Sequence, residues 1–467
     1  MASTSCWKCL VRPSVPLPRS TIASSTAAFS TTTPLAANVV KAKPKGQKPS
    51  KPSMRSGGSL RIKKKAFVKP SGRPPMPGER KALRKRIVLS NTNALEVPDL
   101  VDLNAENLVD PQLVGKVVGL PGPVIDQLRA ADAFKITQGW SLFRRPAMLI
   151  REESVRVVGL MDQAAAKKET YRVVLDGNRG TGKSMLVLQA MTAAFIKGWV
   201  VVNIPECQEL TAATTEYTPI PNTNPTQYTQ HQYAALLLSQ IGKANQAVLS
   251  SLILSMKHPD SPIPLQENIS LARLAELGAR DPEISWELFH IFWREMMVEG
   301  RPPMLISMDS VSHLMGESAY RNPEFKLIHA HDLVLVKHFV DHLSGAAKLP
   351  NGGAVIGAMS RSHAPKLLAV ELALTQQLER QNGQPLSQPQ GFKKYDAPSL
   401  KALGNGNVQV MKVAGLSRDE ARGLMEYWAR SGLLRQTVTE KVVAEKWALA
   451  GNGVVGEIER GALRMRI

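Results

Sequence analysis

Short apolar runs and longer amphipathic segments alternate through the middle of the chain. The short runs are rich in apolar and β-branched residues and have the length of buried strands; they are residues 172–176, 199–205, 304–309 and 354–360. The longer segments carry apolar residues at helical spacing and include residues 185–197, 232–255 and 284–299. Strands that alternate with helices predict an α/β fold, with a parallel sheet covered by helices on both faces.

The sequence on either side of this pattern predicts smaller elements. Before it, PGPVIDQLRAADAF indicates short helices, and an extended piece near Met148 leads into another helix. After it, residues 377–406 are rich in Gln, Pro and Gly, which predicts a mobile polar loop, and residues 407–413 are compatible with a further strand. Ser417 and Glu420 then have the spacing of a capping box, so a helix is expected to start there and to open a C-terminal lid.

Positive charge is concentrated at the N-terminus. The formal net charge is +20, but residues 1–78 contain 15 Lys or Arg and no acid, whereas the rest of the chain contains 44 basic and 39 acidic groups. Residues 1–36 are rich in Ser and Thr and lack the apolar run of a secretory signal, which predicts a mitochondrial transit peptide and a location in the mitochondrial matrix. No apolar run reaches the roughly 18 residues that a membrane-spanning helix needs, so no such helix is expected.

Residues 37–90 predict a basic, disordered arm. Runs such as KAKPKGQKPSKP and RIKKKAFVKP leave too little apolar surface to offset the entropy of an ordered chain. A cationic arm gains free energy when it lies along phosphates and releases their counterions. RNA or a ribosome is therefore the expected contact, and a solvated linker is the alternative.

The first short apolar run leads into a glycine-rich turn with a phosphate-binding pattern. GNRGTGKS fits G-x-x-x-x-G-K-[ST], with a strand before it and an apolar helix after it. In such a turn, backbone N–H groups and the start of the helix face the same phosphates. The expected nucleotide-binding residues are Gly177, Asn178, Arg179, Gly180, Thr181, Gly182, Lys183 and Ser184. Lys183 would reach the β- and γ-phosphates, and the Ser184 hydroxyl would ligate Mg²⁺.

Two other strand ends offer polar groups beside the turn. Asp309 ends the run MLISMD and, like Ser184, is predicted to be a magnesium ligand, directly or through water; a helix cap is the alternative. Ser360 and Arg361 end the run AVIGAMSR and are candidates to face the γ-phosphate, with solvent exposure as the alternative. Ser360 is therefore added to the predicted nucleotide-binding residues.

The groups needed for hydrolysis are harder to find than the groups needed for binding. Hydrolysis requires a base or an amide that positions the attacking water. Many loop-type ATPases place Glu directly after the strand-end Asp, but this chain has Ser310 there. Glu206 and Glu317 are the remaining candidates for a base. We therefore expect a protein that holds nucleotide rather than an enzyme that hydrolyses it rapidly, and we assign no catalytic residue.

Other motifs add little chemistry. KKYD, at residues 393–396, lacks the leading Asn of the N-K-x-D segment with which small GTPases read guanine, so the residues alone do not choose between GTP and ATP. His329 and His331 would face different sides of a helix, which disfavours a metal site. The CWKC pair lies in the predicted leader and Cys207 stands alone, so no cysteine chemistry is expected.

Several of these blocks together resemble the family of the GTP-binding protein of the mitochondrial ribosomal small subunit, also called death-associated protein three. The resemblance runs from about Leu142 to the C-terminus and is carried by GNRGTGKS, WVVVNIP, QYAALLLSQIGKAN, RPPMLISMDSVSHLM, IHAHDLVLVKHFVDHLSG and LPNGGAVIGAMSRS. The last two blocks and the Ser-rich leader resemble fungal members.

The resemblance implies an AAA-like P-loop NTPase fold with a C-terminal helical lid, seated in the head of the small ribosomal subunit. It implies bound GTP or GDP with Mg²⁺, and the preference for guanine rests on the resemblance alone. It also implies contacts with the small-subunit rRNA and neighbouring ribosomal proteins, and a bridge to the large subunit. A free mitochondrial AAA-type ATPase, acting as a chaperone or nucleic-acid remodeller, is the alternative.

The expected organisation follows from these features. Its segments are a transit peptide (1–36), a basic disordered arm (37–90), a helical and extended region that packs on the core (91–170), a P-loop nucleotide-binding domain (171–376), a polar loop (377–406) and a C-terminal lid (407–467).

Overall fold

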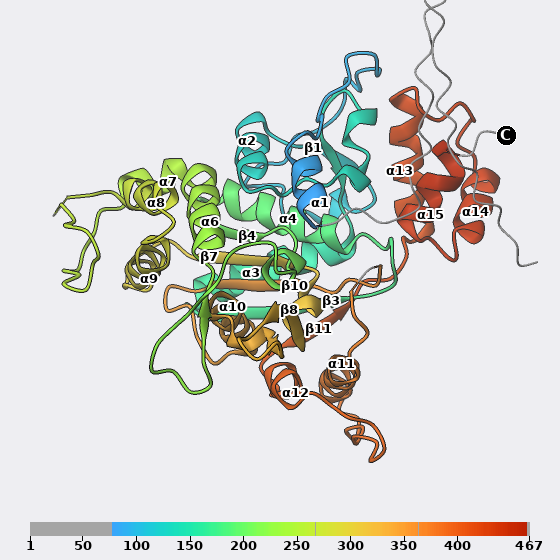
Figure 1. The fold of residues 1–467 in the computed structure, drawn as a ribbon. Helices are drawn as coiled ribbons and strands as arrows, with labels where there is room; N and C mark the ends of the chain where they lie inside the picture. Colours follow the sequence, from blue (N-terminus) through green and yellow to red (C-terminus); the bar gives the residue numbers. More distant parts are fainter. Residues whose placement is uncertain (1–76, 267, 363, 465–467) are drawn as a thin grey trace, which may run out of the picture. The chain divides into compact units, whose positions relative to one another are not determined.

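The computed structural model describes residues 77–266, 268–362 and 364–464. The predicted transit peptide and residues 37–76 of the predicted arm lie outside them. Five of the described strands form a parallel sheet in the order β11–β3–β10–β7–β4 (Figure 1). Their bounds are β3 Thr170–Asp176, β4 Val200–Ile204, β7 Met304–Asp309, β10 Gly353–Ala358 and β11 Gln409–Lys412. The prediction of an α/β fold with a parallel sheet flanked by helices is confirmed.

Alternate side chains of each strand enter two different apolar cores. In β3, Val173 and Leu175 belong to one core, whereas Val174 belongs to the other. The first core includes side chains of α2 (Gly122–Ala130), α3 (Glu152–Ala166) and α4 (Lys183–Ile196). The second includes side chains of α6 (His231–Ala244), α8 (Leu271–Arg280), α9 (Ser285–Met296), α10 (Val334–Ser344) and α11 (Leu368–Gln381). A sheet covered on both faces requires strands that are apolar almost throughout, which is the observed pattern.

The carboxyl ends of the strands gather at the edge that carries the glycine turn. In β10, Ala358 pairs with Leu175 of β3 on one side and with Asp309 of β7 on the other. The strand that bears Asp309 is therefore separated by one strand from the strand that feeds the turn. On the far side of β3, Lys412 of β11 pairs with Asp176.

Shorter elements surround the sheet. Three antiparallel pairs among the described residues are β1 (Val117–Gly119) with β2 (Ala147–Leu149), β5 (Thr218–Pro219) with β6 (Tyr228–Thr229), and β8 (Glu317–Arg321) with β9 (Leu327–His329). The remaining α-helices are α1 (Pro77–Arg84), α5 (Gln208–Thr211), α7 (Gln246–Ser251), α12 (Ala397–Gly404), α13 (Arg418–Arg430), α14 (Glu440–Leu449) and α15 (Val455–Glu459). None of the described helices is long and apolar enough to cross a membrane.

The C-terminal helices form a small core of their own. The predicted capping box is present at the start of α13, because the Ser417 hydroxyl accepts from the Glu420 N–H (3.1 Å) and the Ser417 N–H donates to the Glu420 carboxylate (2.9 Å). Met425 and Trp428 of α13 are buried with Ile458 of α15. The helical unit starts at α13 rather than at residue 407, because β11 is a strand of the main sheet.

The predicted disordered arm extends to residue 90, but its last part is folded. Residues 77–84 form α1, whose Arg80 and Arg84 pair with Glu206 at 2.8 and 3.2 Å. Arg84 also pairs with Glu209 of α5. The carboxylates that compensate this basic helix lie more than a hundred residues away in the sequence, so local composition gave no sign of it.

The predicted polar loop, residues 377–406, also contains helix at both ends. Residues 377–381 complete α11, and α12 occupies 397–404. The Asp396 carboxylate caps α12 by accepting from the Ser399 N–H (2.9 Å), and Leu403 is 1% exposed. A single buried apolar side chain and a cap are weak signals within a sequence rich in Gln and Pro.

Candidate nucleotide-binding site

The glycine turn connects the end of β3 to the start of α4 (Figure 1). Gly180 and Gly182 have φ angles of 80° and 97°, a left-handed conformation that is costly for residues with a side chain. A Cβ atom at Gly177 would lie 2.3 Å from the carbonyl oxygen of Val413. The backbone path of the turn therefore requires glycine at all three positions.

Lys183 folds back over this turn. Its Nζ donates to the carbonyl oxygens of Gly177 (2.8 Å) and Asn178 (2.7 Å), and the residue is only 8% exposed. Burial lowers the pKa of the Lys183 ammonium, although the charges of Asp176 and Asp309 act in the opposite direction. Because hydrogen bonds to charged acceptors are stronger than those to carbonyls, phosphate oxygens would compete well for this ammonium.

The start of α4 offers further donors. Among the described residues, the N–H groups of Lys183, Ser184 and Met185 bond to no backbone carbonyl, and Leu186 is the first residue of the helix whose N–H does so, to Gly182 (3.0 Å). The Ser184 hydroxyl likewise makes no hydrogen bond within the described part of the chain and is half-buried. The first N–H groups of a helix carry a partial positive charge that favours anions.

Neighbouring segments fix the turn. The Arg151 guanidinium, just before α3, donates to the carbonyl oxygen of Thr181 (2.9 Å) and to that of Ala414 (3.2 Å). The N–H of Gly456, in α15, donates to the carbonyl oxygen of Gly180 (3.0 Å). These contacts bind two carbonyls of the turn to segments that are distant in the sequence. Sequence reasoning missed both contacts, since neither residue belongs to a motif.

Asp309 lies at the carboxyl end of β7, as expected, and is 7% exposed. Its carboxylate forms an ion pair with Lys135, which precedes the 3₁₀ turn Ile136–Gln138. Its backbone carbonyl accepts from the N–H of Cys207 (2.8 Å). The structure thus brings Asp309 to the edge that carries the turn and adds a lysine that the sequence did not single out.

Ser360 and Arg361 follow β10 at the same edge. The Ser360 hydroxyl lies 3.2 Å from the Ser362 hydroxyl. The Arg361 guanidinium pairs with Asp176, at the end of β3, at 2.8 Å, and also with Glu371 of α11. Arg361 therefore connects two strand ends beside the turn with a covering helix.

The residues considered as a general base have other surroundings. The carboxylate of Glu206 is engaged by Arg80 and Arg84. Glu317 is exposed on β8, where it pairs with His329 of β9. Ser310, directly after Asp309, is 3% exposed and has a φ of 66°. The Glu206 carboxylate is therefore engaged elsewhere, and Ser310 has no carboxylate to offer.

The histidine pair adopts a geometry that differs from the expected helix. His329 ends β9, and His331 lies in the 3₁₀ turn Ala330–Asp332. Burial lowers the pKa of His331 to about 4, and His329 Nε2 lies 3.3 Å from the carboxylate of Asp396. Within the described ranges, no three His, Cys, Asp or Glu side chains form a group that could hold a metal by themselves. Cys207 is fully buried, which raises the pKa of its thiol well above the usual value.

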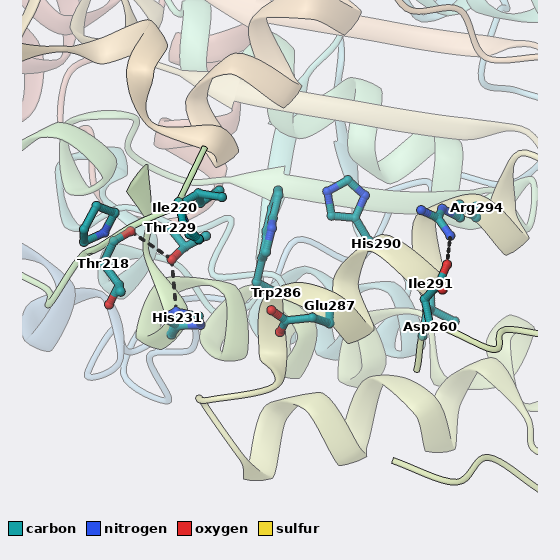
Figure 2. A pocket seen from close by; sticks show the side chains of 12 residues that line it. Thr218, Ile220, Thr229, His231, Asp260, Trp286, Glu287, His290, Ile291 and Arg294 are labelled. Atoms are coloured by element: carbon teal, nitrogen blue, oxygen red, sulfur yellow. Dashed lines mark hydrogen bonds and ion pairs between the residues drawn. The ribbon is translucent and has the colours of Figure 1, made fainter. Parts of the chain in front are cut away.

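A separate cavity of about 390 Å³ lies beside β5, β6 and α9 (Figure 2). Trp286, Glu287 and His290 of α9 line one part of it, and Thr229 and His231 line another, with Thr229 Oγ1 3.0 Å from His231 Nε2. None of its lining residues belongs to the glycine turn. The cavity and the turn are therefore two separate features.

Comparison with known proteins gives one consistent result. The family model described as mitochondrial ribosomal death-associated protein 3 matches residues 148–461, which include the glycine turn and Asp309. The chain is 45% identical to small ribosomal subunit protein mS29 of Neurospora crassa over 479 aligned positions, which cover 99% of both chains. It is 20% identical to the Mus musculus protein of the same name over 231 positions, which cover 47% of this chain and 56% of the mouse protein.

Proposed function

The chain belongs to the mitochondrial ribosomal death-associated protein 3 family, and we propose that it is a structural component of the small subunit of the mitochondrial ribosome that holds a guanine nucleotide in its glycine turn. The ribosomal part is supported by the similarity to a fungal small-subunit protein along nearly the whole chain. This similarity also confirms the resemblance to fungal members and the location at the mitochondrial ribosome.

The observation that carries the nucleotide part is the position of Lys183 above the glycine turn. Its ammonium, the first N–H groups of α4 and the Ser184 hydroxyl supply donors at one place, and a polyphosphate needs such donors. Ser184 and Asp309 would be the protein ligands of a magnesium ion, and the ion would meet Asp309 at a carboxylate that is already paired with Lys135. Bound there, the ion would neutralise charge on the phosphates.

The sheet supports an AAA-like P-loop architecture for this proposal. One strand separates the strand that feeds the turn from the strand that ends in Asp309, and the helical unit that follows the sheet reaches back to the turn through Gly456. The preference for guanine continues to rest on the family resemblance.

We further propose that the chain holds nucleotide without rapid turnover. Ser310 has no carboxylate, and the carboxylate of Glu206 is occupied by two arginines. A slowly exchanging nucleotide would act as a structural cofactor. A free AAA-type ATPase would instead form hexamers and show multiple-turnover hydrolysis.

The experiment that tests this function starts from purified mitochondrial small subunits. They are denatured, and the released nucleotides are separated by chromatography and quantified against the amount of this chain. We expect about one guanine nucleotide per chain, since the turn offers one set of donors. Subunits that contain the chain but release no guanine nucleotide would refute the proposal, as would a chain found only outside ribosomal particles.

The proposed contact with rRNA rests on residues 37–76, because residues 77–84 form α1. Deleting residues 37–76, while keeping the leader and α1, should weaken attachment to the small subunit and reduce its dependence on salt. Co-sedimentation of the full chain and of the deletion variant with small subunits, at several salt concentrations, measures this attachment. An unchanged salt dependence would exclude the RNA-binding role of the arm. The contacts with neighbouring proteins and with the large subunit remain part of the proposal.

A further inference from the structure

We propose that Lys135 competes with the magnesium ion for Asp309, so that the glycine turn binds nucleotide with little dependence on Mg²⁺. This inference rests on the proposed nucleotide binding and concerns the same site. It assigns to a lysine outside the phosphate-binding motif the charge compensation that a metal ion commonly provides.

The first argument is the burial of Asp309. Its side chain is 10% exposed, and a buried carboxylate is strongly destabilising unless a cation or hydrogen-bond donors compensate it. The ammonium of Lys135 provides this compensation within the chain. A carboxylate has lone pairs for both an ammonium and a metal ion, but two cations bound to one carboxylate repel each other. A magnesium ion that binds Asp309 directly must therefore displace Lys135 or share the carboxylate with it.

The second argument is that the structure holds the backbone of Lys135 in place. The Lys135 N–H donates to the side-chain oxygen of Gln138 (2.7 Å), and the same oxygen accepts from the indole N–H of Trp140 (2.7 Å). Trp140 packs edge-on against Phe134, with 5.1 Å between ring centroids, and both rings are buried. The lysine therefore extends from a fixed turn, and less conformational entropy is lost when it pairs with Asp309.

The third argument is that the neighbouring carboxylate is also engaged. Asp176, at the end of β3, pairs with Arg361 at 2.8 Å. Magnesium sites in nucleotide-binding proteins commonly use one or two carboxylates together with phosphate oxygens and water. Here each of the two strand-end aspartates beside the turn already has a side-chain cation as its partner.

The test measures the binding of a fluorescent GDP analogue to the purified full chain, in Mg²⁺ or in EDTA. For the wild-type chain we expect affinities that agree within about threefold. In Lys135→Met the carboxylate has lost its cation, so we expect an affinity at least about tenfold weaker in EDTA than in Mg²⁺. Lys135→Gln, which keeps a donor for Asp309 without the charge, should show the same dependence.

A matched control is available in the same domain. Lys197, at the C-terminal end of α4, pairs with Asp162 and has a side-chain exposure of 20%, close to the 25% of Lys135. Lys197→Met removes a similar ion pair at the end of α4 remote from the turn. We expect this variant to retain the Mg²⁺ independence of the wild-type chain.

The outcomes separate this inference from the proposed function. A wild-type affinity that falls tenfold or more in EDTA overturns the role of Lys135, and this result does not depend on how the variants fold. Equal Mg²⁺ dependence in the wild-type chain and both Lys135 variants overturns it as well. If the analogue does not bind the wild-type chain under either condition, the nucleotide-binding proposal fails, and the inference fails with it.

Discussion

Two buried carboxylates, Glu295 and Asp309, differ in how completely the chain satisfies them. Glu295 of α9 is 0% exposed and accepts from five donors, which are the Ser255 N–H (3.0 Å), the Ser255 hydroxyl (2.8 Å), the Met256 N–H (2.9 Å), His258 Nε2 (2.9 Å) and the Arg301 guanidinium (2.6 Å). Within the part of the chain that the structure describes, Asp309 has one side-chain partner, Lys135. A carboxylate can accept about four hydrogen bonds, so Glu295 is saturated, whereas Asp309 relies on one cation.

The difference separates a carboxylate fixed by several donors from one held by a single ion pair. Burial by itself raises the pKa of Glu295, but the hydrogen bonds from Ser255, His258 and Met256 outweigh it and lower the pKa to about 2. These bonds fasten the segment that follows α7 to α9. Asp309 instead lies at the carboxyl end of a strand, close enough to Lys183 for the charges of the two side chains to interact.

The largest expected effect is the loss of stability when Glu295 is replaced. Glu295→Gln should lower the free energy of unfolding by about 3–5 kcal/mol, because the Arg301 guanidinium, on a side chain only 10% exposed, loses its counter-charge. Urea unfolding measures this. Glu276→Gln, in an exposed pair, serves as the control and should cost less than about 1 kcal/mol. Nucleotide affinity should be unchanged in both variants, and a loss of affinity in Glu295→Gln would remove the distinction between the two carboxylates.

The pH dependence of stability should reflect the titration of Glu295. Since the pKa of Glu295 is about 2 when folded and 4.5 in the reference state, its contribution is present above pH 4.5 and is lost as the pH falls towards 2. The gap in unfolding free energy between the wild-type chain and Glu295→Gln should narrow by about 2 kcal/mol between pH 6 and pH 3. A gap that stays constant over this range would show that Glu295 does not titrate as proposed.

Lys183→Ala should affect binding at the turn. A charge-assisted contact with phosphate is worth about 1.5–3 kcal/mol, which predicts roughly 10- to 150-fold weaker nucleotide binding, and the variant should assemble poorly into small subunits. Fluorescence titration and co-sedimentation measure the two effects. Lys197→Ala, at the other end of α4, is the control. Normal assembly of Lys183→Ala with an empty turn would contradict the role of the nucleotide as a structural cofactor.

The smallest expected effect is the stability change in Asp309→Asn. Lys135 is one-quarter exposed and can turn towards water when its partner is neutral, so the free energy of unfolding should fall by only about 1 kcal/mol. Thermal and urea unfolding of this variant, beside Glu295→Gln, compare the two carboxylates directly. A loss as large as that of Glu295→Gln would mean that Asp309, too, is primarily structural.

The sheet could be predicted from the sequence because the apolar composition of its strands reflects their burial on both faces. The segments that form β4, β7 and β10 are apolar almost throughout, as strands buried on both faces must be, and Ser417 and Glu420 mark the start of α13 through contacts only three residues apart. The glycine turn was recognisable for the same local reason, since its backbone requires glycines at fixed positions.

The rest of the site depends on contacts that sequence patterns do not encode. Lys135 and Asp309 are 174 residues apart, and Arg361 and Asp176 are 185 apart. Arg151 reaches the turn from outside any motif. The fold of α1 has the same origin, because its arginines need the carboxylates of Glu206 and Glu209. Ion pairs between distant segments become visible only once the chain is folded.

The central claim, that the glycine turn holds a guanine nucleotide within the ribosome, is tested most directly by a density map of the purified mitochondrial small subunit. We predict density for a guanine nucleotide whose phosphates contact the N–H groups of the turn and Lys183 Nζ, with that Nζ moved away from the carbonyls of Gly177 and Asn178. A turn without nucleotide density, in which Lys183 still donates to those two carbonyls, would contradict the claim.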